Sequence, residues 1–115
     1  MNNARFTAPS SVIIGDPEIG EGTWIGHFTV LDGSGGLKIG KNCSIASGVH
    51  VYTHSTHLLV TESKEKLVGS VEIGDNVAIG ANSVVMYDVK IGSNVCIPAL
   101  TVVKPHMKIE VNGAK

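Results

Sequence analysis

The sequence has few arginines, few cysteines and no long apolar run. Arg5 is the only arginine among 115 residues, and the formal net charge is −1, so no basic face exists that could neutralise nucleic-acid phosphates. Cys43 and Cys96 are an isolated pair, which favours free thiols in a reducing compartment. No segment reaches the roughly 18 apolar residues of a membrane span, and MNNARFTAPSS lacks the apolar core of a signal peptide. We therefore expect a cytoplasmic protein that binds neither nucleic acid nor membrane.

Aromatic residues are also scarce, at 4% of the chain, whereas glycine occurs 14 times beside an excess of Val and Ile. Apolar spacing typical of helices is absent throughout. A chain of this length suffices for one domain with a core, so we expect a single domain over residues 1–115. The unusual composition makes an internal repeat the first feature to look for.

An aliphatic residue recurs at every sixth position. These positions hold Ile13, Ile19, Ile25, Leu31, Ile39, Ile45, Val51, Ile73, Ile79, Val85, Ile91, Ile97, Val103 and Ile109. Two extra residues precede Ile39, and a 16-residue insertion precedes Ile73. A period of six with one buried aliphatic and a following small residue describes a short strand and a bend, and three such units close a triangular coil.

Stacked coils of this kind predict three columns of buried aliphatic residues. The columns are Ile19, Ile39, Ile73, Ile91 and Ile109; then Ile25, Ile45, Ile79 and Ile97; then Ile13, Leu31, Val51, Val85 and Val103. With coils about 4.8 Å apart, Cys43 and Cys96 are separated by two coils, about 10 Å, which is too far for a disulfide.

This repeat resembles that of the hexapeptide-repeat, or isoleucine-patch, acyltransferases over residues 12–104. The resemblance implies an all-β fold, the left-handed parallel β-helix, with about five triangular coils. Handedness comes from the resemblance alone, because parallel crossovers are right-handed in about 98% of cases. The stretches WIGHFTVLDGSGGLKIGKNCSIASGVHVYTHSTH and VEIGDNVAIGANSVV look most like the sugar O- and N-acetyltransferases. Those relatives use acetyl-CoA and act as homotrimers.

The 16-residue insertion predicts a polar loop over about residues 55–70, leaving the helix beside the histidine-rich stretch VHVYTHSTH. Loops of this length without structure of their own are usually functional, and members of the family project one over a neighbouring subunit's active site. One interpretation of the three histidines is that they are solvated corner residues, which we expect for His50 and equally for His27 and His106.

A second interpretation is a metal site, because the γ-class carbonic anhydrases share this fold and bind zinc through histidines of two subunits. A chain that resembled those enzymes at the metal site would have a histidine pair five residues apart, a third histidine on a distant coil, and a structural arginine. Here the histidine spacings are four and three, and Arg5 is far away in the sequence. We therefore expect no metal.

The third interpretation is acyl transfer, with one histidine as the general base. A free imidazole has a pKa near 6.5, so it is mostly neutral yet still basic at neutral pH, and a positioned base contributes roughly 10² to 10⁴ in rate. His54 resembles the family's histidine in Tyr52-Thr53-His54, and a one-residue shift in register would select His57. Ser55 replaces the acidic residue that follows the base in some relatives, so Asp32 or Asp88 would have to orient the imidazole.

The resemblance also assigns substrate-binding residues. Asp32 and Tyr52 are placed near the acceptor sugar, although Asp32 is equally well explained as an Asp-Gly turn residue. Trp24 is outward-facing, which suits sugar stacking or a subunit contact. We expect Trp24 and Val30 to share one apolar flank that a trimer buries.

For acetyl-CoA, the resemblance indicates the small residues Gly80, Ala81 and Ala99 along the pantetheine arm, with Lys104 available to phosphates. Three departures from the family pattern, Ala78, Pro98 and Leu100, leave open a different class: a catalytically silent scaffold or binding subunit. The short C-terminal stretch EVNGAK also suggests that this chain supplies no cap to its last coil.

Overall fold

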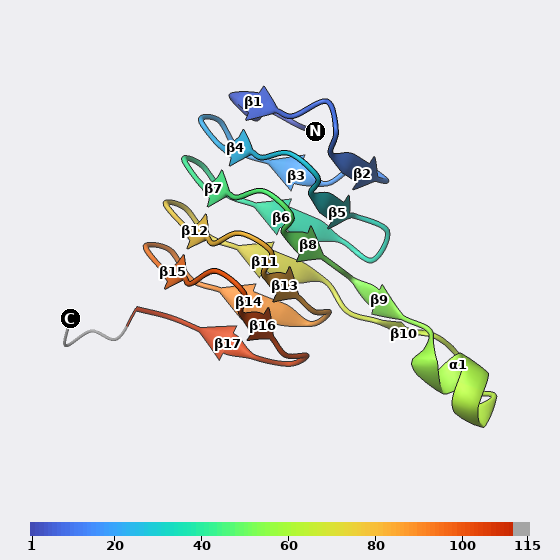
Figure 1. Cartoon of the computed structure of the whole chain (residues 1–115). Helices are drawn as coiled ribbons and strands as arrows, with labels where there is room; N and C mark the ends of the chain where they lie inside the picture. Colours follow the sequence, from blue (N-terminus) through green and yellow to red (C-terminus); the bar gives the residue numbers. More distant parts are fainter. Residues whose placement is uncertain (112–115) are drawn as a thin grey trace.

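A computed structural model of the protein describes residues 1–111. The chain winds as a left-handed parallel β-helix of about six turns, counting partial coils at both ends, close to the five predicted (Figure 1). Its strands form three parallel sheets of five, one on each flank of a triangular prism. Most of the segment EVNGAK lies outside the described residues, so the expectation about the C-terminal cap has no structural counterpart.

The strands are short, because each hexad contributes only two or three extended residues before the chain bends. The first sheet contains β3 (Glu18–Ile19), β6 (Leu37–Ile39), β11 (Val71–Ile73), β14 (Val89–Ile91) and β17 (Lys108–Ile109). The second contains β1 (Phe6–Thr7), β4 (Trp24–Ile25), β7 (Ser44–Ile45), β12 (Ala78–Ile79) and β15 (Cys96–Ile97). The third contains β2 (Val12–Ile14), β5 (Val30–Asp32), β8 (His50–Val51), β13 (Val84–Val85) and β16 (Val102–Val103).

The three predicted columns are confirmed by the strand register. Ile19 pairs with Ile39 and Ile39 with Ile73, and the second and third columns stack in the same way. The column residues are buried in one continuous core, except for Ile13 and Ile109 in the end coils, which are partly exposed. Each buried aliphatic side chain contributes roughly 1.5–3 kcal/mol, so the columns are the main source of stability.

The bends between flanks depend on residues that tolerate close approach or a left-handed backbone. A Cβ on Gly20 would lie 2.6 Å from the carbonyl carbon of Gly40 in the next coil, so only glycine permits this stacking distance. Asn42, Asn76 and Asn94 occupy one corner on successive coils with φ of 55°, 56° and 64°. Asparagine is among the few residues that adopt this conformation at low cost.

The outward faces of the sheets differ in chemistry. The first sheet presents a charged column, Glu18, Lys38, Glu72, Lys90 and Lys108, whereas the third presents Val12, Val30, His50, Val84 and Val102. Trp24 lies on the second sheet and Val30 on the third, so the expectation that they share one flank is wrong. The reason is the coil itself, since one hexad separates them and each hexad turns the chain onto a new flank.

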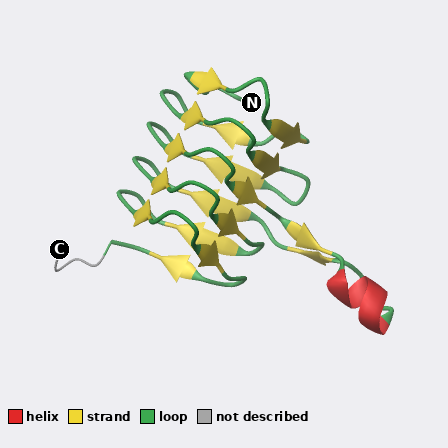
Figure 2. Ribbon diagram, in the orientation of Figure 1, coloured by secondary structure: helices red, strands yellow, loops and turns green. Residues whose placement is uncertain are grey.

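The 16-residue insertion is not a plain loop, contrary to expectation. It forms an arm, residues 54–68, made of β9 (His54–Ser55), helix α1 (His57–Glu62) and β10 (Leu67–Val68). Strands β9 and β10 pair antiparallel, with His54 opposite Val68. The arm extends away from the stacked coils, and α1 buries none of its residues (Figure 2).

Candidate active site

Both interruptions of the repeat occur at the same corner of the prism, where the chain passes from the third sheet to the first. We call this the insertion corner. The two extra residues enlarge the bend 32–36, and the arm leaves from the same corner on the next coil. At the base of the arm, the Gly69 N–H donates to the Thr53 carbonyl at 2.9 Å. Two irregular segments are therefore held side by side on an otherwise regular helix.

At this corner the structure joins His54 to Asp32. The His54 Nδ1 and the Asp32 Oδ2 lie 2.6 Å apart, although 22 residues separate them in the sequence. Asp32 ends β5 and His54 begins β9, so one residue comes from each of the two irregular segments. Of the two carboxylates that the sequence left open as orienting partners, Asp32 occupies that position.

The carboxylate of Asp32 is buried and receives several hydrogen bonds. Its Oδ2 accepts from the Thr53 backbone N–H at 3.0 Å, and its Oδ1 from the Ser34 backbone N–H at 3.0 Å. The Thr53 hydroxyl lies 3.1 Å from both Oδ2 and the Asp32 carbonyl oxygen. Burial alone would raise the pKa of Asp32, but hydrogen bonds from Ser34, Thr53 and His54 outweigh it and lower the pKa well below its ordinary value.

An ionised carboxylate only accepts hydrogen bonds, so the proton between the two side chains belongs to His54 Nδ1. In a neutral imidazole this leaves the lone pair on Nε2. The His54 side chain is 35% exposed while that of Asp32 is fully buried. The arrangement is therefore an oriented imidazole, which is partly exposed and has its Nδ1 held by a buried anion.

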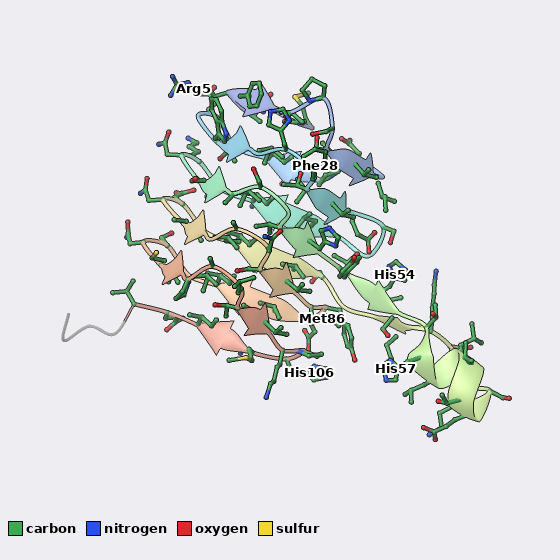
Figure 3. All side chains as sticks on the ribbon, in the orientation of Figure 1. Arg5, Phe28, His54, His57, Met86 and His106 are labelled. Carbon is green, nitrogen blue, oxygen red and sulfur yellow. The ribbon has the colours of Figure 1, made fainter. Side chains whose placement is uncertain are left out.

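His57, the other candidate base, lies elsewhere. It begins α1, is exposed, and its Nδ1 lies 2.6 Å from the Ser55 hydroxyl oxygen. The imidazoles of His54 and His57 lie on opposite sides of the arm (Figure 3). The structure thus does not bring His57 into contact with Asp32.

Tyr52 lies beside this Asp–His pair. Asp32 follows Leu31 and Tyr52 follows Val51, and Leu31 pairs with Val51, so Asp32 and Tyr52 occupy equivalent positions on adjacent coils. The Tyr52 hydroxyl lies 2.8 Å from the Nδ1 of His50. The sequence had suggested that His50 is a corner residue. In the structure it is an outward residue of strand β8.

Trp24 is not brought to this corner. It lies on the second flank, where its ring stacks on Phe6 with centroids 4.3 Å apart and an interplanar angle of 27°. The indole is half exposed. Within one chain Trp24 therefore forms part of an aromatic surface near the first coils and does not contact the Asp–His pair.

Three of the four residues expected to bind acetyl-CoA gather at the corner between the second and third sheets. The Ala81 carbonyl accepts from the Leu100 N–H at 2.9 Å, and a Cβ on Gly80 would lie 2.3 Å from the nitrogen of Ala99. The absence of a side chain at Gly80 therefore lets the two adjacent coils stack closely at this corner. Lys104 follows β16 at the insertion corner, apart from the other three.

Sequence reasoning left Thr53, Ser34 and Gly35 without a role. The Thr53 hydroxyl accepts from the Gly35 N–H at 2.8 Å, and thereby ties the enlarged bend to the base of the arm. A signal for these residues was present, because the spacing of the columns already places both insertions at one corner on adjacent coils.

A second Asp–His pair lies two coils further along the insertion corner. The His106 Nδ1 and the Asp88 Oδ2 are also 2.6 Å apart, and the His106 ring packs edge-on against Tyr87. Both members of this pair are well exposed. Asp88 therefore pairs with a different histidine from the one the sequence had suggested.

Within residues 1–111, no three His, Cys, Asp or Glu side chains converge as ligands for a metal ion. No helix in this part of the chain has the length and apolar character needed to cross a bilayer. Cys43 is buried and Cys96 exposed, on coils two apart, and both are free thiols as predicted.

Comparison with known proteins finds the hexapeptide repeat. Residues 70–105 match the family model described as bacterial transferase hexapeptide (six repeats). AntD, an N-acyltransferase from Bacillus cereus solved with dTDP and 3-hydroxybutyryl-CoA, superposes with a TM-score of 0.81 at 25% identity, over 99% of this chain and 66% of that one.

Two curated relatives have different activities. Serine acetyltransferase of Staphylococcus epidermidis is 38% identical over 75% of this chain and 48% of its own length. Gamma carbonic anhydrase 1 of Arabidopsis thaliana is 39% identical over 74% of this chain and 29% of its own length. The chain thus spans less than half of these curated relatives.

Proposed function

We propose that the chain, which matches the bacterial transferase hexapeptide model over residues 70–105, is an acyltransferase that moves an acetyl group from acetyl-CoA to a hydroxyl or amine of a sugar or sugar nucleotide. The observation that carries this proposal is the 2.6 Å contact between His54 and the buried carboxylate of Asp32. An imidazole oriented in this way is suited to general-base catalysis, which acyl transfer from a thioester requires.

In the proposed reaction, His54 Nε2 removes the proton from the acceptor hydroxyl or amine as its oxygen or nitrogen attacks the thioester carbonyl carbon. A new C–O or C–N bond forms, the C–S bond breaks, and the proton held on His54 passes to the departing thiolate of CoA. Asp32 stabilises the imidazolium that exists between these two transfers and keeps its ring oriented, as carboxylates do in related catalytic arrangements. We assign Asp32 to this role and not to acceptor binding, because its oxygens are occupied by donors of the protein.

For the donor, we propose that the pantetheine arm lies along the corner that carries Gly80, Ala81 and Ala99. His54 and Lys104 lie on the insertion corner, a different edge of the same prism, so in this proposal they reach the thioester and the phosphates from a neighbouring subunit. Small side chains allow the ligand to approach the backbone closely, and backbone N–H groups there would stabilise the thioester oxygen. AntD is described in complex with an acyl-CoA, which supports acetyl-CoA as the donor.

For the acceptor, we propose a sugar nucleotide bound beside Tyr52, since AntD is also described with dTDP. Trp24 could contact the acceptor only from another subunit, so its role requires an oligomer. We propose a cytoplasmic homotrimer that buries the valine-rich outward face of the third sheet. Light scattering tests the trimer, and a monomeric mass at micromolar concentration would remove Trp24 from the site.

The proposal is tested first by calorimetry with acetyl-CoA. Binding in the micromolar range is expected, and Gly80→Val should abolish it by crowding the backbone of Ala99. The variant's circular dichroism and melting temperature must be measured beside it, because the same substitution can disturb coil stacking. A folded parent protein that binds no acetyl-CoA would favour the silent scaffold, which the departures at Ala78, Pro98 and Leu100 also suggest.

The carbonic anhydrase relatives raise a second candidate, a zinc site shared between subunits. We propose that the protein works without metal, because its histidine spacings differ from those the γ-class resemblance requires. Elemental analysis of the purified protein and treatment with a chelator test this. Zinc bound in stoichiometric amount would revive the carbonic anhydrase interpretation.

A further inference from the structure

His50 has a specific partner. Its Nδ1 lies 2.8 Å from the Tyr52 hydroxyl, and the two rings meet edge to face with centroids 5.8 Å apart and an interplanar angle of 86°. Both side chains are partly buried. Residues i and i+2 of an extended segment point to the same side, so the contact follows directly from the strand geometry. The sequence had suggested only a solvated residue at this position.

The pair lies next to the catalytic arrangement. His50 is in the outward column of the third sheet, between Val30 and Val84 on the neighbouring coils. From there it reaches toward the insertion corner, where Tyr52 is adjacent in register to Asp32 and two residues before His54. The Tyr52 hydroxyl thus links His50, which is not part of the Asp–His pair, to the surface beside His54.

We propose that His50 is a positioning residue, which holds the Tyr52 hydroxyl so that its oxygen receives the acceptor. This inference rests on the proposed function. A phenol hydroxyl can donate one hydrogen bond or accept others, and a free one rotates between these roles. In the tautomer of His50 that carries its proton on Nε2, the Tyr52 hydroxyl donates to Nδ1 and its oxygen then offers only lone pairs to the substrate; this tautomer is part of the proposal.

The consequence is a preference for the chemical class of acceptor. An oxygen that only accepts hydrogen bonds favours a substrate group that donates one, such as a sugar hydroxyl or an amine N–H. For an amine, such a bond would use one N–H and leave the other proton for His54 to remove. For a diol, one hydroxyl would donate to Tyr52 and His54 would remove the proton of the neighbouring hydroxyl. A hydrogen-bond acceptor such as a carboxylate is disfavoured there.

The test is a double-mutant cycle on acceptor kinetics. His50→Ala and Tyr52→Phe should each raise the KM for the acceptor about 3- to 10-fold, with little change in kcat or in acetyl-CoA binding. The double variant should be no worse than either single one, because both remove the same interaction. His50→Asn should recover most of the loss, since the asparagine Oδ1 can occupy the position of the imidazole Nδ1.

His27→Asn is the matched control, because its Nδ1 also contacts a hydroxyl, that of Ser10 at 2.9 Å, on another part of the molecule. It should leave the KM unchanged. Additive effects of His50→Ala and Tyr52→Phe, or an unchanged KM in an active His50→Ala variant, would overturn the inference. An inactive parent enzyme would instead refute the proposed function.

A second measurement is independent of activity. The chain has only two tyrosines, so the ring signals of Tyr52 and Tyr87 can be resolved by NMR with labelled tyrosine. His50→Ala should shift the Tyr52 signals and leave those of Tyr87, whereas His106→Ala should do the reverse because His106 packs on Tyr87. If His50→Ala leaves Tyr52 unshifted, the hydrogen bond is absent in solution and the inference fails.

Discussion

Two Asp–His pairs lie on the insertion corner, and they have the same contact geometry. In each, a histidine Nδ1 lies 2.6 Å from an aspartate Oδ2. They differ in their surroundings, because the side chains of His54 and Asp32 are 35% and 0% exposed, whereas those of His106 and Asp88 are 70% and 58% exposed. A short contact between these residue types is therefore not in itself the mark of a catalytic site.

The decisive difference is the support that each carboxylate receives. Asp32 accepts hydrogen bonds from Thr53 and Ser34 besides His54, whereas within residues 1–111 the Asp88 side chain is hydrogen-bonded by His106 alone. A buried and saturated carboxylate has one orientation, and so has the imidazole it holds. An exposed pair is screened by water and gains little from its contact.

The largest expected effect comes from removing the two imidazoles. His54→Ala should lower acetyl transfer by about 10² to 10⁴ with little change in acetyl-CoA affinity, because the imidazole acts on the proton being transferred. His106→Ala should leave the rate within about twofold. Steady-state kinetics with calorimetry of acetyl-CoA binding measure both. Equal losses in the two variants would mean that the surroundings of Asp32 do not distinguish the pairs.

Next in size is the exchange of each carboxylate for an amide. Asp32→Asn should lower kcat by about 10²-fold or more, because asparagine no longer enforces the tautomer of His54 with a basic Nε2. Asp88→Asn is the matched change and should have no measurable effect on kcat. An Asp32→Asn variant with the parent's kcat would remove the carboxylate from the mechanism.

Asp32→Asn and Asp88→Asn should also differ in their free energy of unfolding. Since the pKa of Asp32 is lowered in the folded protein, its contribution is complete above the carboxyl's ordinary pKa of about 4 and is lost as the pH falls from there through the folded pKa. Asp32→Asn should cost about 1–3 kcal/mol at pH 7, and this difference should shrink in acid. Urea unfolding at pH 7 and pH 3 measures it. A constant difference would contradict the assigned ionisation.

A smaller effect is expected from the bend that supports Thr53. A Cβ on Gly35 would lie 2.5 Å from the Thr53 carbonyl oxygen and 2.9 Å from Val68, so Gly35→Ala must displace the base of the arm. We expect a loss of about 1–3 kcal/mol in unfolding free energy and of about tenfold in kcat. Gly92→Ala is the control, since its Cβ would meet nothing closer than 3.4 Å. An unchanged kcat in Gly35→Ala would show that the Asp–His pair tolerates movement of its support.

The smallest effect is expected from removing the imidazole of His57. Among the described residues the His57 side chain is hydrogen-bonded only to the half-buried Ser55, so His57→Ala should lower kcat by no more than a few-fold. If His57→Ala proves more damaging than His54→Ala, the arm rearranges on substrate binding and the base is the later histidine.

Much of the fold could be predicted because the six residues of each hexad are enough to identify its buried position. Ile45 is predicted to be buried from its own six-residue unit, and its neighbours Ile25 and Ile79 follow from counting alone. The arm could not be predicted in this way, since its sixteen residues carry no repeat, and strand pairing such as His54 with Val68 depends on contacts across the loop. The flank of Trp24 was misjudged although the count sufficed, because Ile25 and Leu31 fall in different columns and the outward residues before them therefore lie on different flanks.

The sequence by itself determined the coil, the three columns and the place of both insertions, and the family resemblance left His54 and His57 as candidate bases. Only the tertiary structure decided which carboxylate contacts His54. Asp32 and Asp88 are equally plausible in sequence, and they flank His54 on either side of the insertion. The enlarged bend 32–36 folds against Thr53 at the base of the arm, and this packing buries Asp32 while it leaves Asp88 exposed to solvent. Burial and hydrogen-bond saturation arise between segments distant in the chain, so no local pattern of residues could have shown them.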